Sequence, residues 1–185
     1  MPRTCWARCD LLATAAFVLA FLLVLPSLLM AEEPLSEYQV KAAFLLNFTR
    51  FIEWPASAFE TAESPLGICI LGDDPFGAEL DALVEGETVN DRKLTVRRIE
   101  RTAIPRSCQV LFINKSEKDI AEILHGAGPG LLTVSDRDGF LREGGMIAFV
   151  TKDRHVRFDI NQRAAVKASL IISSRMLSVA RSVQK

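Results

Sequence analysis

Residues 66–75 read LGICILGDDP, a run of six uncharged and mostly apolar residues followed at once by a turn. CQVLFI at 108–113 and LLTVS at 131–135 repeat the pattern further along the chain. Strands that are apolar throughout are typical of a parallel sheet covered on both faces. Strands with one solvent-exposed face instead alternate between apolar and polar residues. The three runs therefore predict the centre of a covered, mostly parallel sheet.

Helical patterns alternate with these runs and complete the fold prediction. Helices are expected over 36–52, 75–85, 117–125 and 161–184, a further strand over 93–99, and a hairpin of strands 146–150 and 155–160. This order predicts an α/β fold, a three-layer sandwich with a mostly parallel sheet, helices on both faces and a C-terminal edge hairpin.

The first 31 residues have the pattern of a secretory signal peptide. Arg3 and Arg8 precede an apolar block over 11–25, and Ala31 precedes an acidic stretch. An uncleaved anchor is the competing interpretation, because residues 11–30 reach the length of about 20 that crosses a bilayer. We expect a signal peptide over 1–31, a single domain over 32–185, and export.

Composition excludes one class of partner. The 185 residues carry a formal net charge of −1, so nothing indicates the strongly basic face of a nucleic-acid-binding protein.

Cys69 and Cys108 are the two cysteines of the expected mature chain, and each lies in or beside an apolar run. In an oxidising compartment they favour a structural disulfide, closing a loop of about 40 residues and contributing about 4 kcal/mol in the chain-entropy model. Two buried free thiols are the alternative. An order that places strands 66–71 and 108–113 side by side would bring the two cysteines together.

Patterns for catalysis are weak. Asp73 and Asp74 follow the first strand, where sites gather in doubly wound sheets, and they resemble the acidic pair of a receiver domain. A receiver needs a third aspartate after its third strand, where this chain has Asn114 and Lys115. We favour a turn and helix cap over a metal or phosphate site. The glycines of 126–130 indicate a plain loop, and no catalytic residue, metal site or cofactor is predicted.

The aromatic helix and two sets of polar residues, one on that helix and one near the C-terminus, are candidates for binding a partner or an anionic ligand. The aromatic helix from Tyr38 to Trp54 is the first candidate for a partner or dimer surface, with a purely core role for its aromatics as the alternative. Solvated surface charge is the alternative for the polar residues. The candidates are Lys41, Asn47, Arg50, Trp54, Arg157, Asn161 and Arg175.

Several phrases together resemble the YfiR family of periplasmic regulators. They are YQVKAAFLLNF at 38–48, FIEWP at 51–55, GDDPFG at 72–77, CQVLFI at 108–113, LTVSD at 132–136, GGMI at 144–147, VRFDIN at 156–161 and ISS at 172–174.

The resemblance implies a non-enzymatic repressor that binds the periplasmic region of an inner-membrane diguanylate cyclase and limits cyclic-di-GMP synthesis and biofilm formation. It also implies a homodimer, an outer-membrane lipoprotein that sequesters the repressor, and disulfide bonds. The best-known member has two disulfides, whereas this chain can form one. A sensor histidine kinase as partner, or a stand-alone binder of small molecules, are the alternatives.

Overall fold

The computed structural model describes residues 35–100 and 104–185, and residues 35–185 group as one compact unit. The expected signal peptide lies outside the described residues. Along the chain the helices are α2 (Glu37–Phe51), η2 (Ala56–Ala58), α3 (Ala78–Val84), α4 (Ile120–His125), α5 (Gln162–Lys167) and α6 (Ser174–Val179). The strands are β1 (Ile52–Glu53), β2 (Leu66–Leu71), β3 (Thr88–Val89), β4 (Arg92–Ile99), β5 (Val110–Ile113), β6 (Leu132–Ser135), β7 (Ile147–Lys152), β8 (His155–Asn161), β9 (Ile171–Ile172) and β10 (Ser182–Gln184).

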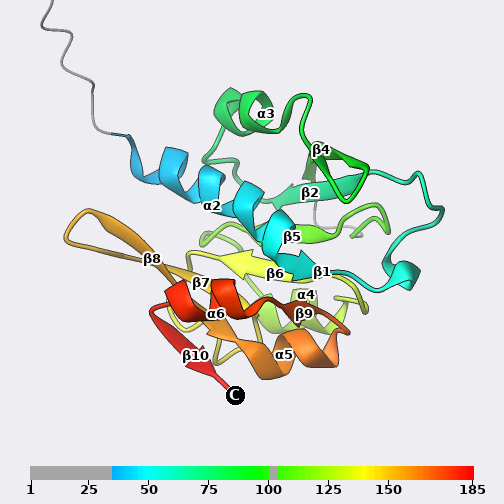
Figure 1. Cartoon of the computed structure of the whole chain (residues 1–185). Helices are drawn as coiled ribbons and strands as arrows, with labels where there is room; N and C mark the ends of the chain where they lie inside the picture. Colours follow the sequence, from blue (N-terminus) through cyan, green and yellow to red (C-terminus); the bar gives the residue numbers. More distant parts are fainter. Residues whose placement is uncertain (1–34, 101–103) are drawn as a thin grey trace, which may run out of the picture. The chain divides into compact units, whose positions relative to one another are not determined.

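The main sheet has eight strands in the order β10-β8-β7-β6-β5-β2-β4-β3 (Figure 1). Strands β4, β2, β5, β6 and β7 run parallel, and their spatial order is the doubly wound order 2-1-3-4-5. The β7–β8 hairpin then adds an antiparallel pair, as the sequence predicted. The α/β sandwich with a mostly parallel sheet is therefore confirmed.

Strand β2 explains why the central runs are apolar throughout. Ile68 and Ile70 point into the core cluster beneath α2, α3, α5 and α6, while Cys69 and Leu71 point into the cluster beneath α4. Each of the four side chains is at most 2% exposed. Because both faces of the sheet are covered, every side chain of this strand is buried, which favours a continuous apolar run.

Helix α2 begins where the sequence predicted. Ser36 accepts a hydrogen bond from the backbone N–H of Gln39, and the Gln39 side chain accepts one from the Ser36 N–H, which completes a capping box. Phe44 and Phe48 of this helix pack against Phe149 and Phe158 of the β7–β8 hairpin. The helix ends at Phe51, because Ile52 and Glu53 pair with β9 as a short second sheet.

The expected long helix over 161–184 is wrong. Ser169 has a φ of 61° and ends α5, and the Ser173 hydroxyl accepts from Met176 N–H to begin α6. Between them β9 pairs with β1, and after Ala180 the chain turns extended so that β10 pairs with β8. Helical spacing of apolar residues was present, but tertiary strand pairing and a serine cap divide the segment.

The helices expected over 75–85 and 117–125 are shorter than predicted. Helix α3 begins after Gly77 and α4 begins after Asp119, both of which have positive φ angles. Among the described residues, no helix combines the length and apolar character that crossing a bilayer requires.

Candidate ligand pocket and disulfide-held crossover

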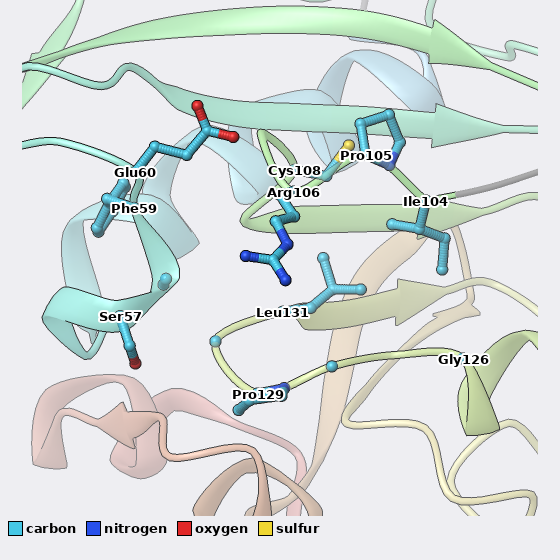
Figure 2. A pocket seen from close by; sticks show the side chains of 13 residues that line it. Ser57, Phe59, Glu60, Ile104, Pro105, Arg106, Cys108, Gly126, Pro129 and Leu131 are labelled. Atoms are coloured by element: carbon cyan, nitrogen blue, oxygen red, sulfur yellow. The ribbon is translucent and has the colours of Figure 1, made fainter.

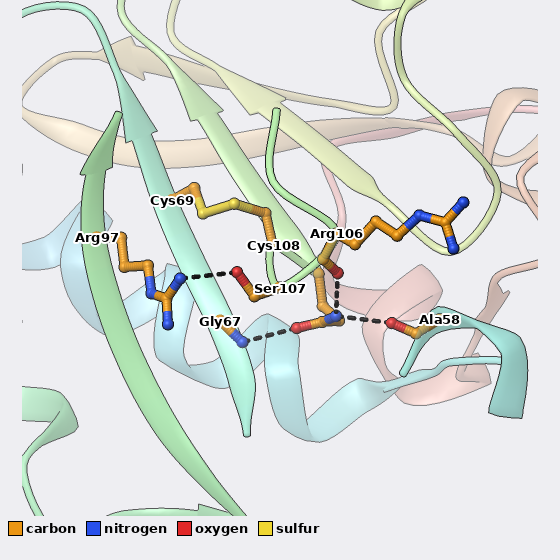
Figure 3. Close-up of a disulfide and its surroundings, with 8 residues drawn as sticks. Ala58, Gly67, Cys69, Arg97, Arg106, Ser107 and Cys108 are labelled. Carbon is orange, nitrogen blue, oxygen red and sulfur yellow. Dashed lines mark hydrogen bonds between the residues drawn. A yellow bond between two sulfur atoms is a disulfide. The ribbon is translucent and has the colours of Figure 1, made fainter. Parts of the chain in front are cut away.

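Residues 107–109, the end of the crossover that leads into β5, lie directly against β2. Cys108 forms the predicted disulfide with Cys69, and the Cα atoms of the two cysteines are 5.7 Å apart (Figure 3). A Cβ at Gly67 would lie 2.0 Å from the carbonyl oxygen of Ser107, so only glycine permits this approach. Arg97 also donates to the Ser107 hydroxyl over 2.8 Å. A covalent bond, a close backbone contact and a hydrogen bond therefore hold residues 107–108 on the sheet.

Gln109 ties three segments together beside the disulfide. Its carboxamide oxygen accepts from Gly67 N–H at 2.8 Å, and its nitrogen donates to the carbonyls of Ala58 (2.8 Å) and Arg106 (3.2 Å) (Figure 3). The residue is 1% exposed. Since unpaired backbone groups are costly to bury, this side chain fixes the position of η2 and of the crossover relative to β2.

A pocket opens at this end of the sheet, where the parallel strands begin (Figure 2). Its volume is about 420 Å³, within the range of small-molecule sites. Three segments distant in sequence line it: η2 with the residues after it, the crossover before β5, and the loop before β6. The lining residues are Ser57, Ala58, Phe59, Glu60, Ile104, Pro105, Arg106, Cys108, Gly126, Gly128, Pro129, Gly130 and Leu131.

The pocket combines apolar walls with two charges. Cys108 and Leu131 are each 5% exposed and contribute buried apolar surface. Glu60 and Arg106 are exposed, and the Arg106 guanidinium points into the pocket (Figure 2). Across residues 35–100 and 104–185, neither charge has an ion-pair partner. The arrangement suits an anion with an apolar body.

Gly130 places the loop before β6 against η2. Its φ is +78°, and a Cβ there would lie 2.5 Å from the Ala58 Cβ. Its N–H donates to the Ala168 carbonyl at 2.8 Å, which joins the loop to the end of α5. The interpretation of 126–130 as a loop is confirmed, and its glycine has a packing role rather than a nucleotide-binding one.

The opposite end of the sheet, where doubly wound folds commonly bind ligands, is filled by the chain's own side chains. Asn114 donates to the Asp73 carbonyl at 2.8 Å, and Ser116 donates to the Asp73 carboxylate at 3.3 Å. A Cβ at Gly72 would lie 2.5 Å from a carboxylate oxygen of Glu117. The crevice between β2 and β5 is therefore occupied.

Asp74 stabilises the turn predicted for it. Its carboxylate accepts from Phe76 N–H and from Arg98, both at 2.8 Å. It is not the helix cap, because Gly77 stands at the cap of α3 and makes no side-chain bond there. Arg98 also binds Asp81, whose pKa this hydrogen bond lowers. Within the described ranges, no three acidic, histidine or cysteine side chains gather as metal ligands do.

Lys41 lies inside the domain. Its ammonium is 2.8 Å from the Asp136 carboxylate, and the two side chains are 2% and 4% exposed. Tyr38 donates a hydrogen bond to the same Asp136 oxygen at 2.8 Å. Burial is the main cause that raises the pKa of Tyr38, and this hydrogen bond is the second. Glu37 also pairs with Lys41, and the hydrogen bond from Lys41 lowers the Glu37 pKa. The charge of Lys41 is thus neutralised internally.

The other candidate binding residues are spread over α2, β8, α6 and the segment between β1 and η2. On α2, Asn47 donates to the Ala43 carbonyl and exposed Arg50 pairs with Glu87 at 2.6 Å. Trp54 is half-buried and its ring N–H donates to the Gln109 carbonyl at 3.3 Å. Asn161 caps α5 by accepting from Ala164 N–H. Arg157 on β8 and Arg175 on α6 are exposed. No hydrogen bond or ion pair among described residues joins these candidates into one cluster.

Sequence reasoning missed the pocket itself. Glu60, Arg106 and Leu131 come from segments that no local motif connects, and only the strand order brings them together. The available signal was indirect: each segment precedes an apolar strand, and the starts of neighbouring parallel strands lie at one sheet edge.

Fold and site together define an α/β domain with a disulfide-held pocket at the beginning of its parallel strands. The sequence matches the model of the YfiR/HmsC-like family over residues 38–181. The chain therefore belongs to the YfiR/HmsC-like family, whose members are periplasmic regulators rather than enzymes. No individually curated protein matches the sequence.

Proposed function

We propose that this protein is exported, binds the periplasmic region of an inner-membrane diguanylate cyclase, and holds that enzyme in its inactive state. The observation that carries the proposal is the family match, which spans nearly all of the described domain. A periplasmic location agrees with the Cys69–Cys108 disulfide, because such bonds persist in oxidising compartments.

Control of this kind requires different affinities for two states of the partner. The regulator represses the cyclase only if it binds the inactive state more tightly than the active one. A coupling of about 1–3 kcal/mol, or 5–150-fold, is typical of such regulation. No covalent chemistry is needed, so the protein acts as a binding module with no cofactor.

Exposed polar residues on α2 and α6 form the proposed contact surface. Asn47, Arg50 and Arg175 are exposed and are its members, whereas Arg157 alternates with the core residues Val156 and Phe158 and so points away from the sheet face that α2 covers. Trp54, Lys41 and Asn161 support the surface from within through their hydrogen bonds and ion pairs. Arg50 is the best probe, because its pair with Glu87 is exposed on both sides and contributes little to folding.

The test begins in the native cell. Deleting the gene should raise cyclic-di-GMP and biofilm, and crosslinking of the tagged protein in the intact envelope should capture an inner-membrane cyclase identified by mass spectrometry. Arg50→Glu should weaken capture and derepress the cyclase while the protein remains folded. Arg142→Glu, a charge reversal at another exposed arginine, should leave both readouts unchanged.

Other outcomes redirect the proposal. If crosslinking captures a sensor kinase and deletion of the gene leaves cyclic-di-GMP unchanged, the partner is the kinase and not a cyclase. Recovery of no membrane protein, under conditions that capture a known regulator pair, would overturn the regulatory role and leave a stand-alone binder of small molecules. The same crosslinks should show a homodimer. If an outer-membrane lipoprotein sequesters this regulator, the crosslinks should capture that lipoprotein as well.

A further inference from the structure

The pocket at the beginning of the parallel strands has the composition of a ligand site that the fold itself does not use. The internal polar groups around it are already engaged: Gln109 bonds Gly67, Ala58 and Arg106, and Gly130 bonds Ala168. The Arg106 guanidinium is different, because it points into the pocket and has no ion-pair partner in the described part of the chain.

The charges on the rim limit the ligand. Arginine presents a planar fork of donors that matches a carboxylate or a phosphate in two parallel hydrogen bonds. Glu60 lines the same pocket and is exposed there (Figure 2). Its negative charge opposes a dianion such as phosphate more strongly than a monoanion, since Coulomb energy scales with charge. A single carboxylate therefore fits the rim better than a phosphate group.

The walls and the volume define the rest of the ligand. Leu131 and Cys108 offer buried apolar surface, and Pro105 and Pro129 lie at the sides (Figure 2). A space of about 420 Å³ holds a ligand of small organic size and excludes a folded macromolecule. We infer that this pocket binds a small organic monocarboxylate, with its carboxylate on Arg106 and its apolar body against Leu131.

Such a ligand would add contacts between three segments that Gln109 and Gly130 already hold close together. It would touch η2, the disulfide-held crossover and the loop before β6, and that loop is bonded through Gly130 to the end of α5. Occupancy would therefore stabilise the folded state by mass action. The inference concerns the isolated chain and does not depend on the proposed membrane partner.

The direct test is an amide NMR titration of the purified, isotope-labelled chain with benzoate and with hexanoate. Benzamide serves as the uncharged counterpart of benzoate, and inorganic phosphate as the competing anion. We expect saturable shifts of the Gly128, Gly130 and Leu131 amides with at least one carboxylate, and at least tenfold weaker binding of benzamide and phosphate.

Three variants locate the site. Arg106→Gln should weaken carboxylate binding at least tenfold, whereas Arg142→Gln, at an exposed arginine outside the pocket, should not change it. Gly128→Leu should also reduce binding by filling the pocket, because a Cβ at Gly128 meets no atom within 4 Å and the fold tolerates it. Circular dichroism and thermal unfolding establish that each variant is folded.

The inference is overturned by any of three results with the folded protein. Neither carboxylate produces saturable shifts, or Arg106→Gln and Arg142→Gln bind equally well, or phosphate binds more tightly than both carboxylates at these amides.

Discussion

The ammonium of Lys41 and the carboxylate of Asp136 lie 2.8 Å apart in the interior, with both side chains almost fully excluded from solvent. Asp136 accepts from Tyr38 at the same oxygen, while its other oxygen has no hydrogen-bond partner within the described residues. A buried carboxylate satisfied on one side depends strongly on its cation, because an unpaired buried charge is far more costly than a buried pair.

Lys41→Met should therefore destabilise the domain by about 3–5 kcal/mol, since it leaves Asp136 charged and buried without its partner. The double variant Lys41→Met with Asp136→Asn should recover much of this loss, because asparagine is neutral and still accepts from Tyr38. Urea unfolding of the two single variants and the double variant gives the coupling energy. Additive losses would show that the pair is not coupled.

The same residue shows how far sequence reasoning reached. Lys41 was a candidate for binding because lysine on an amphipathic helix is ordinarily at the surface. Its burial depends on Asp136, which is 95 residues away and follows β6. Helix α2, its cap and the apolar strand runs are local patterns and were predictable. The pairing of Lys41 with Asp136 depends on which strand lies beneath the helix.

The C-terminal segment and the pocket were unpredictable for a related reason. Apolar spacing over 161–184 predicts one helix, yet β9 and β10 are strands because β1 and β8 offer free edges to pair with. The disulfide was predictable because an expected exported chain with an even pair of cysteines, each in or beside an apolar run, favours a bond between them. Arg106 carried no comparable signal, since its significance comes from the empty space beside it.

Gly130→Ala tests the close packing of the loop before β6 against η2. The φ of +78° and the 2.5 Å approach to the Ala58 Cβ should together cost about 1–3 kcal/mol. Gly128→Ala is the matched control two residues earlier, where an added Cβ meets no atom within 4 Å. Thermal unfolding should separate the two variants clearly. Equal stabilities would mean that the loop does not rest on η2 in solution.

Removing the disulfide should lower stability without changing the fold. The bond joins residues 39 apart in sequence. In the chain-entropy model a loop of this length stabilises the folded state by about 4 kcal/mol. The Cys69→Ala with Cys108→Ala variant should lose about that much in denaturant unfolding. Dithiothreitol should reproduce the loss in the wild-type protein and have no effect on the variant. A wild-type stability that is insensitive to reduction would contradict a structural role.

Asp159 and Arg181 make stability depend on pH at acidic values. Arg181 donates to the Asp159 carboxylate from its Nε at 2.8 Å and from Nη2, and this hydrogen bonding lowers the Asp159 pKa below its ordinary value of 3.8. The Arg181 N–H also bonds to the Phe158 carbonyl just before β10, so the pair helps to hold the terminal strand. The unfolded chain binds the Asp159 proton at a higher pH than the folded chain does. Acidification therefore favours unfolding.

The contribution of Asp159 should be complete above its ordinary pKa and disappear as the pH falls through the lower pKa of the folded state. The difference in free energy of unfolding between the wild type and Asp159→Asn should thus be constant from about pH 5 to 8 and shrink below about pH 4. Asp153→Asn, at the exposed tip of the β7–β8 hairpin, is the control and should change little. A difference that persists unchanged into strong acid would mean that the loss in Asp159→Asn comes from packing and not from the ion pair.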